Sequence, residues 1–408
     1  MISISIKDLG LSGTLPSQIG SFGSLSYLSL SGNQIRGSIP SSIGAMISLS
    51  AFDVYSNALT GSIPVSIGLL AALQRLYLNS NAVTGSIPAS ISALTGLTDL
   101  VLSHNSLRGS IPPSIGSLVA LQALYLNGNR LTGSIPASIS ALTGLRYLYL
   151  FTNSLSGSIP ASIGSLVALQ ALYLYTNSLT STIPASISAL TGLTYLDLSF
   201  NSLSGSIPAS IGSLVALQTL YLYYNSLTGT IPASISALTG LTNLYLSINS
   251  LSGSIPATIG SLTALQRLYL DTNSLTGSIP ASISALTGLT DLAINQNTLW
   301  GSIPASVGSL VSLQTLYLYS NSLSGTIPPT ISALTGLTYL DLQSNYLTMG
   351  TSTAVPTSTF SAATSAGNLF LSSNCLVYRS SAHPTQNTKA THCRAITCKS
   401  SVIQRSIM

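Results

Sequence analysis

Few side chains in this chain have the chemistry of a catalytic group. The strongest candidate is His104, which follows Ser103 directly and lies near Asp99 in the sequence. A nucleophile and its base must face each other within hydrogen-bonding reach, whereas Ser103 and His104 are neighbours on one predicted strand. No nucleotide-binding or metalloprotease motif accompanies them. We therefore predict a protein that is not an enzyme and that uses no cofactor.

The cysteines lie together near the end of the sequence, at Cys375, Cys393 and Cys398, and His383 and His392 lie among them. Structural zinc sites usually contain cysteines two residues apart, and this spacing is absent. We predict no metal site. A disulfide between Cys375 and Cys393 is the favoured interpretation, with free thiols as the alternative, and Cys398 has no assigned role.

Charge and hydropathy exclude two further classes of protein. The seven acidic residues are all aspartates, and the net charge is +5. Up to residue 374, seven basic residues balance the seven aspartates, so the excess lies in the last residues. A nucleic-acid interface needs basic residues clustered along one surface. No apolar run reaches the roughly 18 residues that a membrane-spanning helix requires.

One pattern dominates the sequence, a repeat of 24 residues. Its frame, LxxLxLxxNxLxGxIPxxIGxLxx, alternates leucines with other residues in a short predicted strand. The asparagine after that strand is expected to bond to the backbone of neighbouring coils. Fourteen asparagines recur in register: Asn33, Asn57, Asn81, Asn105, Asn129, Asn153, Asn177, Asn201, Asn225, Asn249, Asn273, Asn297, Asn321 and Asn345.

The repeat predicts an α/β repeat fold, a right-handed solenoid of about sixteen coils with a parallel β-sheet on its concave face. The first coil begins at Met1, with Leu9 in place of the asparagine. We expect the solenoid at residues 1–374, with an irregular last coil at 346–374, and a cysteine-containing basic cap or tail at 375–408. A second period of 48 residues alternates coils carrying IGSLVALQ with coils carrying ISALTGLT.

Tyrosine is concentrated on the predicted concave face. Seventeen of the nineteen tyrosines occupy the third, fifth, seventh or eighth position of a coil. Tyrosine offers a large, stiff contact surface and a hydroxyl group, although it is also a common strand residue. The predicted ligand-binding residues are Tyr77, Tyr125, Tyr147, Tyr149, Tyr173, Tyr175, Tyr195, Asp197, Tyr221, Tyr223, Tyr245, Tyr269, Asp271, Tyr317, Tyr319, Tyr339 and Asp341.

A second surface offers an alternative function. The residues three and five places after each asparagine are mostly Thr or Ser, for example Thr132 with Ser134 and Thr276 with Ser278. If these segments stack as strands, two straight columns of hydroxyls would repeat about every 4.8 Å. This arrangement favours ice binding, although Arg36, Arg108 and Trp300 interrupt it.

The repeat frame, with its LxGxIP segment, resembles the plant-type leucine-rich repeat. The resemblance covers about residues 1–374 and is similar to receptor-like kinase and receptor-like protein ectodomains and to polygalacturonase inhibitors. It implies a recognition protein, outside the cell or on its surface, that binds a protein, a peptide or a cell-wall glycan. The signal peptide and cysteine-paired cap usual in such ectodomains are not visible, which suggests an N-terminally incomplete chain. An intracellular scaffold is the alternative.

Overall fold

The computed structural model describes residues 2–348 and 369–370. The chain divides into two compact units, Met1–Leu251 and Ser252–Met408, called unit 1 and unit 2. The tail expected at 375–408, including Cys375 and Cys393, lies outside the described residues.

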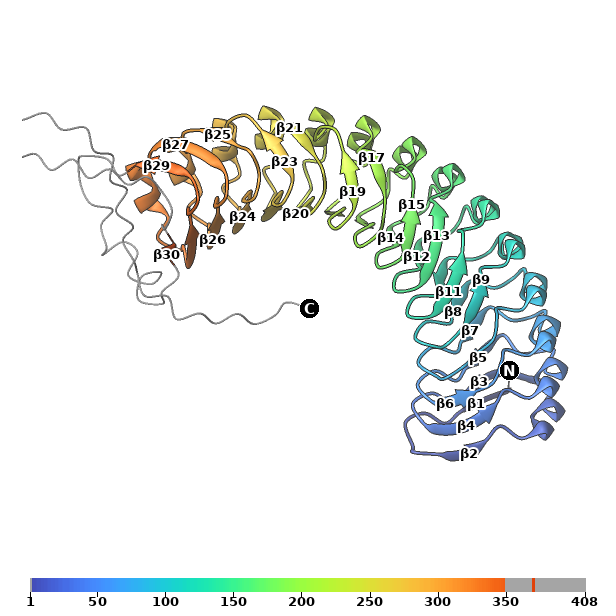
Figure 1. Ribbon diagram of the computed structural model, residues 1–408. Helices are drawn as coiled ribbons and strands as arrows, with labels where there is room; N and C mark the ends of the chain where they lie inside the picture. The colour runs from blue at the N-terminus through green and yellow to red at the C-terminus, as the bar shows by residue number, and fades with distance from the viewer. Residues whose placement is uncertain (1, 349–368, 371–408) are drawn as a thin grey trace, which may run out of the picture. The chain divides into compact units, whose positions relative to one another are not determined.

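The main sheet of unit 1 is parallel, and each coil adds one strand to it. In unit 1 these strands line the inner side of the curve that the coils follow, and short helices line the outer side (Figure 1). The strands, in sheet order, are β1 (Ile2–Ser5), β3 (Leu25–Ser29), β5 (Ala51–Asp53), β7 (Arg75–Tyr77), β8 (Asp99–Val101), β10 (Ala123–Tyr125), β12 (Tyr147–Tyr149), β14 (Ala171–Tyr173), β16 (Tyr195–Asp197), β18 (Thr219–Tyr221) and β20 (Asn243–Tyr245).

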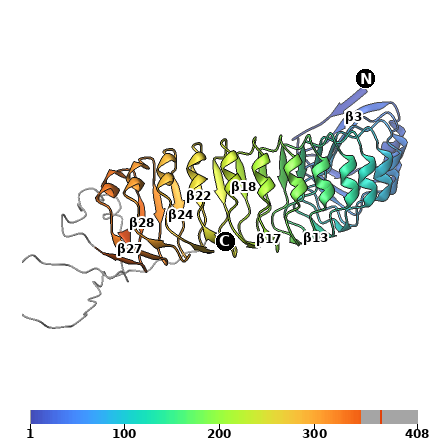
Figure 2. The same cartoon turned by 90° about the horizontal axis from the view of Figure 1, so that it is seen from above.

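Unit 2 has the same construction. Its main-sheet strands β22, β24 and β28 form successive rungs when viewed from above (Figure 2). The strands of this sheet are β22 (Arg267–Tyr269), β24 (Asp291–Ala293), β26 (Thr315–Tyr317), β28 (Tyr339–Asp341) and β30 (Leu369–Phe370). The predicted leucine-rich-repeat solenoid with a parallel sheet is therefore confirmed.

The helices of the described residues are single 3-10 turns rather than α-helices, which refines the predicted α/β class. In each, a proline holds extended backbone at the helix start, as at Pro160 (φ −65°, ψ 138°). They are η1 (Ser17–Ser21), η2 (Ser41–Ala45), η3 (Val65–Leu69), η4 (Ala89–Ala93), η5 (Pro113–Ser117), η6 (Ala137–Ala141), η7 (Ala161–Ser165), η8 (Ala185–Ala189), η9 (Ala209–Ser213) and η10 (Ala233–Ala237) in unit 1. Unit 2 has η11 (Ala257–Ser261), η12 (Ala281–Ala285), η13 (Ala305–Ser309) and η14 (Pro329–Ala333).

Short strands after the asparagines form smaller parallel sheets on a second surface, called the ledge. In unit 1 these are β2 (Ser12–Thr14), β4 (Gln34–Ser38), β6 (Ala58–Thr60), β9 (Arg108–Ser110), β11 (Arg130–Gly133), β13 (Ser154–Ser158), β15 (Ser178–Thr180), β17 (Ser204–Ser206) and β19 (Ser226–Thr228). In unit 2 they are β21 (Ser252–Ser254), β23 (Ser274–Thr276), β25 (Trp300–Gly301), β27 (Ser322–Thr326) and β29 (Tyr346–Thr348).

The leucines and isoleucines of the frame form the core between the main sheet and the helices. In one coil, Leu145, Leu148, Leu150 and Leu155 are all fully buried. Burial of such a side chain contributes about 1.5–3 kcal/mol. The first coil is less filled, and a cavity of about 290 Å³ lies among Ile4, Leu11, Leu15 and Phe22.

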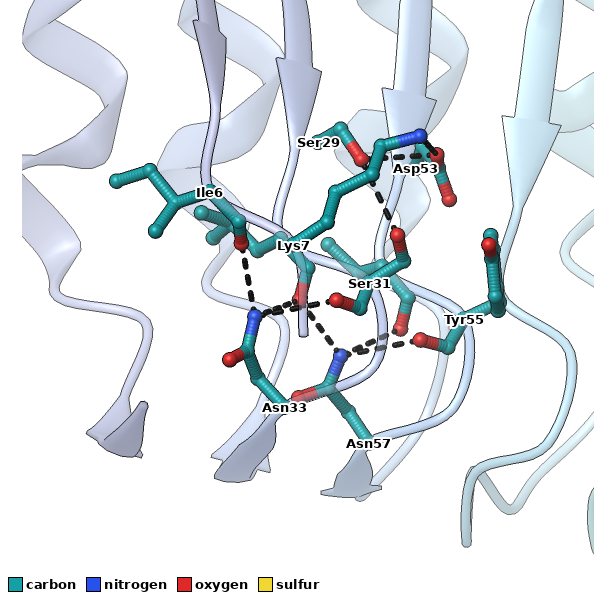
Figure 3. Close-up of polar contacts among 10 residues, drawn as sticks. Ile6, Lys7, Ser29, Ser31, Asn33, Asp53, Tyr55 and Asn57 are labelled. Atoms are coloured by element: carbon teal, nitrogen blue, oxygen red, sulfur yellow. Dashed lines mark hydrogen bonds and ion pairs between the residues drawn. The ribbon is translucent and has the colours of Figure 1, made fainter. Parts of the chain in front are cut away.

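Each asparagine ties its own coil to the preceding one. Asn57 Oδ1 accepts a hydrogen bond from the Ile35 N–H (2.9 Å), and Asn57 Nδ2 donates to the carbonyls of Leu30 (3.0 Å) and Val54 (3.2 Å). Asn33 bonds in the same way to the first coil, with Nδ2 donating to the Ile6 carbonyl (2.8 Å) (Figure 3). The bonds satisfy backbone groups that would otherwise be buried without partners.

The 48-residue period has a structural counterpart on the helix side of unit 1. Ser138 Oγ and Ser186 Oγ each donate to a backbone carbonyl of the preceding coil at 2.6 Å, whereas the bonds from Ser162 and Ser210 measure 3.0 and 3.1 Å. The tight contacts occur where a glycine such as Gly164 stands in the preceding coil. A Cβ on Gly164 would lie 2.5 Å from the Ser186 carbonyl oxygen.

We therefore expect Gly164→Ala to destabilise the protein by about 1–3 kcal/mol, because the added methyl group pushes two packed coils apart. The matched control is Ser188→Ala, at the same position of the next coil, which should change stability by less than about 0.5 kcal/mol. Denaturant midpoints of both variants measure the difference. Equal midpoints would show that the coil contact at Gly164 is not close.

Candidate ligand-binding site

The main sheet brings tyrosine rings from consecutive coils of unit 1 into direct contact. The rings form an unbroken series, called the tyrosine ladder: Tyr125, Tyr149, Tyr173, Tyr195, Tyr221 and Tyr245. Tyr125 stacks on Tyr149 with ring centroids 4.4 Å apart, and Tyr149 meets Tyr173 edge to face at 4.5 Å. The remaining centroid separations are 4.5, 5.7 and 4.4 Å.

The strand register explains why these rings meet. Tyr125, Tyr149 and Tyr173 occupy the same position of successive strands and are direct partners in the parallel ladder. Because neighbouring strands lie about 4.8 Å apart, side chains at one position are separated by about the distance at which aromatic rings stack. The ladder follows from the 24-residue period combined with the choice of tyrosine.

Further aromatic rings flank the ladder, and two of them are phenylalanines that the sequence prediction missed. Phe151 stacks on Tyr175 at 4.4 Å, and Phe200 stacks on Tyr224 at 4.6 Å. Both occupy the seventh or eighth position of a coil, where the analysis of tyrosines alone had no reason to find them. Tyr147 and Tyr223 also contact ladder rings, Tyr149 and Tyr221 respectively.

Not every predicted site residue joins this cluster. Tyr77 is separated from Tyr125 in the sheet by Val101, which pairs with both. In unit 2, Ala293 stands between Tyr269 and Tyr317 in the same way. Tyr317 and Tyr319 contact each other edge to face at 6.3 Å. Asp271 is half-buried beside this column, and Tyr339 is exposed.

The ladder tyrosines stay neutral at physiological pH. Burial is the main cause that raises the pKa of Tyr125 and of Tyr173 to about 12, and burial also raises the pKa of Tyr195. Their hydroxyls therefore remain hydrogen-bond donors. A surface of this kind combines apolar ring faces with polar edges.

Two aspartates that the sequence placed on this face are almost completely buried. Asp197 is 6% exposed and Asp341 is 7% exposed. Asp197 Oδ1 accepts hydrogen bonds from the N–H (3.0 Å) and the hydroxyl (2.6 Å) of Ser199. Burial raises the pKa of each carboxyl group to about 6, against the opposing effect of these hydrogen bonds in Asp197 and of those from Gln343 in Asp341.

The ledge differs from the straight columns that the ice-binding alternative depends on. Thr132 pairs in the sheet with Ser110 on one side and Ser154 on the other, 22 residues away in each direction. A row of neighbouring hydroxyls therefore joins different positions of successive coils, and each row contains three of them. The expected column at 24-residue spacing is displaced by two residues at every coil.

Other candidate chemistry finds no support among residues 2–348 and 369–370. The exposed His104 has Asn127 as its partner, with His104 Nε2 and Asn127 Nδ2 3.3 Å apart. No group of three or more metal-ligating side chains occurs in this part of the chain. Its helices are all too short or too polar to cross a membrane.

Comparison with known proteins agrees with this architecture. Family models described as leucine-rich repeat match residues 24–46, 72–131, 95–155, 143–203 and 287–347, and a leucine-rich repeat region model matches residues 178–301. A search of curated proteins found no match.

Among solved structures, the plant peptide hormone receptor RGFR1 in complex with RGF2 has a TM-score of 0.83 and 36% identity, covering 93% of this chain and 62% of the receptor chain. The Arabidopsis receptor kinase HAESA, in complex with the peptide hormone IDA and the co-receptor SERK1, has a TM-score of 0.76 and 33% identity over 91% of this chain and 66% of that chain. This chain thus spans less than two thirds of either receptor chain.

A leucine-rich-repeat protein of Leptospira interrogans is 32% identical, with a TM-score of 0.61, over 84% of this chain and 90% of that protein.

Asp197→Asn tests the burial of this carboxyl group. Its pKa of about 6, above the ordinary 3.8, means that the folded state binds the proton more tightly than the unfolded state. Stability is therefore highest below about pH 4 and falls as the pH rises through 6. Asparagine avoids this loss, so we expect the variant to be more stable than the wild type at pH 7.5, by on the order of 2 kcal/mol, and about equal at pH 4.

Denaturant midpoints of the two proteins at both pH values check this expectation. A variant that is no more stable than the wild type at pH 7.5 would contradict the burial of a charged carboxylate.

The repeat frame, the parallel sheets, the family matches and the structural relatives lead to one assignment: the chain belongs to the leucine-rich-repeat family, with repeats of the plant type.

Proposed function

We propose that this protein recognises an extended peptide segment outside the cell and that the segment lies along the tyrosine ladder of unit 1. The observation that carries the proposal is the continuous ring contact from Tyr125 to Tyr245. Leucine-rich-repeat ectodomains similar to this chain are ligand-recognition modules, and two of them are described in complex with peptide hormones.

The dimensions of the ladder suit such a ligand. Six consecutive coils with strands about 4.8 Å apart span roughly 24 Å. An extended peptide advances about 3.3 Å per residue, so about seven residues would cover the ladder. The half-buried rings offer flat apolar surfaces, and the neutral hydroxyls offer donors and acceptors for the peptide backbone.

Charge favours a polypeptide over a nucleic acid on this surface. From Phe151 to Tyr245 the sequence contains no lysine or arginine, and Asp197 is its one acidic residue. A phosphate backbone would find no counter-charge there. Glycan binding, the other ligand class that the sequence suggested, is not favoured by any of the similar structures.

The test begins with peptides selected from a displayed library of random 12-residue sequences on the purified protein. Tyr173→Ala and Tyr221→Ala should each raise the Kd of a selected peptide about tenfold or more, because central aromatic residues dominate binding energy. Fluorescence polarisation of the labelled peptide measures the change.

Tyr346→Ala is the matched control, since Tyr346 is an exposed tyrosine on the ledge strand β29. It should change the Kd less than twofold. Retention of full affinity in both ladder variants, or failure of the library to yield any binder, would refute peptide recognition by the ladder.

A further inference from the structure

One column of the main sheet contains a carboxylate where its neighbours carry aromatic rings. Along the fifth position of successive coils of unit 1 the sheet presents Tyr149, Tyr173, Asp197, Tyr221 and Tyr245. Tyr173 and Tyr221 are the direct strand partners of Asp197. A single acidic group is therefore enclosed on both sides within the tyrosine ladder.

Ring contacts bridge the gap that Asp197 leaves in the column. Tyr195, two residues before Asp197 on β16, stacks on Tyr173 at 4.5 Å and meets Tyr221 edge to face at 5.7 Å. The negative charge of Asp197 contributes to raising the pKa values of Tyr173, Tyr175, Tyr195 and Tyr223. These rings therefore surround the carboxylate closely enough to sense its charge.

No cation of the protein offsets this charge in the part of the chain that the structure describes. The two ion pairs found there join Lys7 to Asp53 at 3.3 Å and Arg267 to Asp291 at 3.5 Å. The hydrogen bonds that Asp197 accepts from Ser199 use only Oδ1, which leaves Oδ2 without a hydrogen bond. A buried carboxylate is normally paired with a positive charge.

Unit 2 repeats the same arrangement. Tyr339-Leu340-Asp341 has the same sequence as Tyr195-Leu196-Asp197, and Asp341 pairs in the sheet with Tyr317. The charge of Asp341 contributes to raising the pKa values of Tyr317 and Tyr319. The combination of a buried aspartate with tyrosines of the preceding coil is thus a recurring feature rather than an isolated one.

We propose that Asp197 and the rings of Tyr173, Tyr195 and Tyr221 form a subsite for one basic side chain, lysine or arginine, of the bound peptide. The ring faces attract a cation through their negative quadrupole, and Oδ2 provides a charged acceptor. The incoming cation supplies the counter-charge that the protein lacks. This inference rests on the proposed peptide-binding function and adds to it the chemistry of the central ligand residue.

Asparagine separates this role from a merely structural one. The hydrogen bonds from Ser199 stabilise the turn after β16, and an asparagine Oδ1 at position 197 can accept both of them. Asp197→Asn should therefore preserve the fold while removing the charge. If the aspartate served only the turn, the variant would bind the same ligands as the wild type.

The experiment compares three proteins in the selection from random peptides: wild type, Asp197→Asn and Asp8→Asn. Asp8 is an exposed residue of the first coil with a φ of 54°, which asparagine tolerates, so Asp8→Asn controls for the loss of one negative charge. Wild type and Asp8→Asn should both enrich lysine or arginine at one fixed peptide position, and Asp197→Asn should not.

A second measurement does not depend on the variant's folding. A wild-type-selected peptide and its copy with citrulline or norleucine in place of the basic residue are titrated against wild type. The neutral copy should bind at least about tenfold more weakly to wild type, and the two peptides should differ less than twofold on Asp197→Asn.

Selected peptides that lack a basic preference, yet depend on Tyr173 and Tyr221, would overturn this inference alone and leave peptide recognition intact. Equal discrimination by wild type and Asp197→Asn would overturn it as well. A library that yields no binder to the wild type would refute both the subsite and the proposed function.

Discussion

The hydrogen bonds of the repeated asparagines are the constraint on which the rest of this structure depends. Each side chain links the turn of its own coil to two backbone groups of the coil before it, as Asn177 does with Leu155 N–H (3.0 Å) and the Leu150 carbonyl (3.0 Å). These bonds require a fixed number of residues between equivalent turns. An inserted residue would leave buried backbone groups unpaired, which costs about 1–3 kcal/mol for each group. The exact repetition of 24 residues follows from this requirement.

Fixed spacing converts a residue preference into a surface. Because equivalent residues of consecutive coils are direct strand partners, tyrosines at one position must stand ring against ring, as Tyr221 and Tyr245 do at 4.4 Å. The same rule places Asp197 within the column, where it is deprived of water without gaining a positive partner. Stacked rings and an uncompensated carboxylate are both consequences of the asparagine-bonded stack. Together they give the protein a ligand surface that is apolar along its length and acidic at one point.

Much of this could be predicted from the sequence, because the repeat makes local patterns global. The asparagine positions, the alternation of buried leucines and the face that carries Tyr173 and Tyr221 all follow from counting residues. The roles of Phe151 and Phe200 were also within reach, since they share the seventh and eighth positions with tyrosines.

Other features depend on geometry that spacing does not determine. The burial of Asp197 depends on the turn in which Ser199 donates to its side chain. The displacement of ledge residues such as Thr132 by two residues per coil depends on how the chain leaves the asparagine turn. The limits of the tyrosine ladder depend on single residues, such as Val101, whose effect appears only once strand partners are known.

Hydroxyl-radical footprinting of the tyrosines, with and without a selected peptide, tests the central claim most directly. The claim is that ligand lies along the ring series of unit 1. It predicts that Tyr173, Tyr195 and Tyr221 lose reactivity when the peptide binds, while the exposed Tyr346 of the ledge keeps its reactivity. Unchanged labelling of the ladder tyrosines in the saturated complex, or protection confined to the ledge, would contradict it.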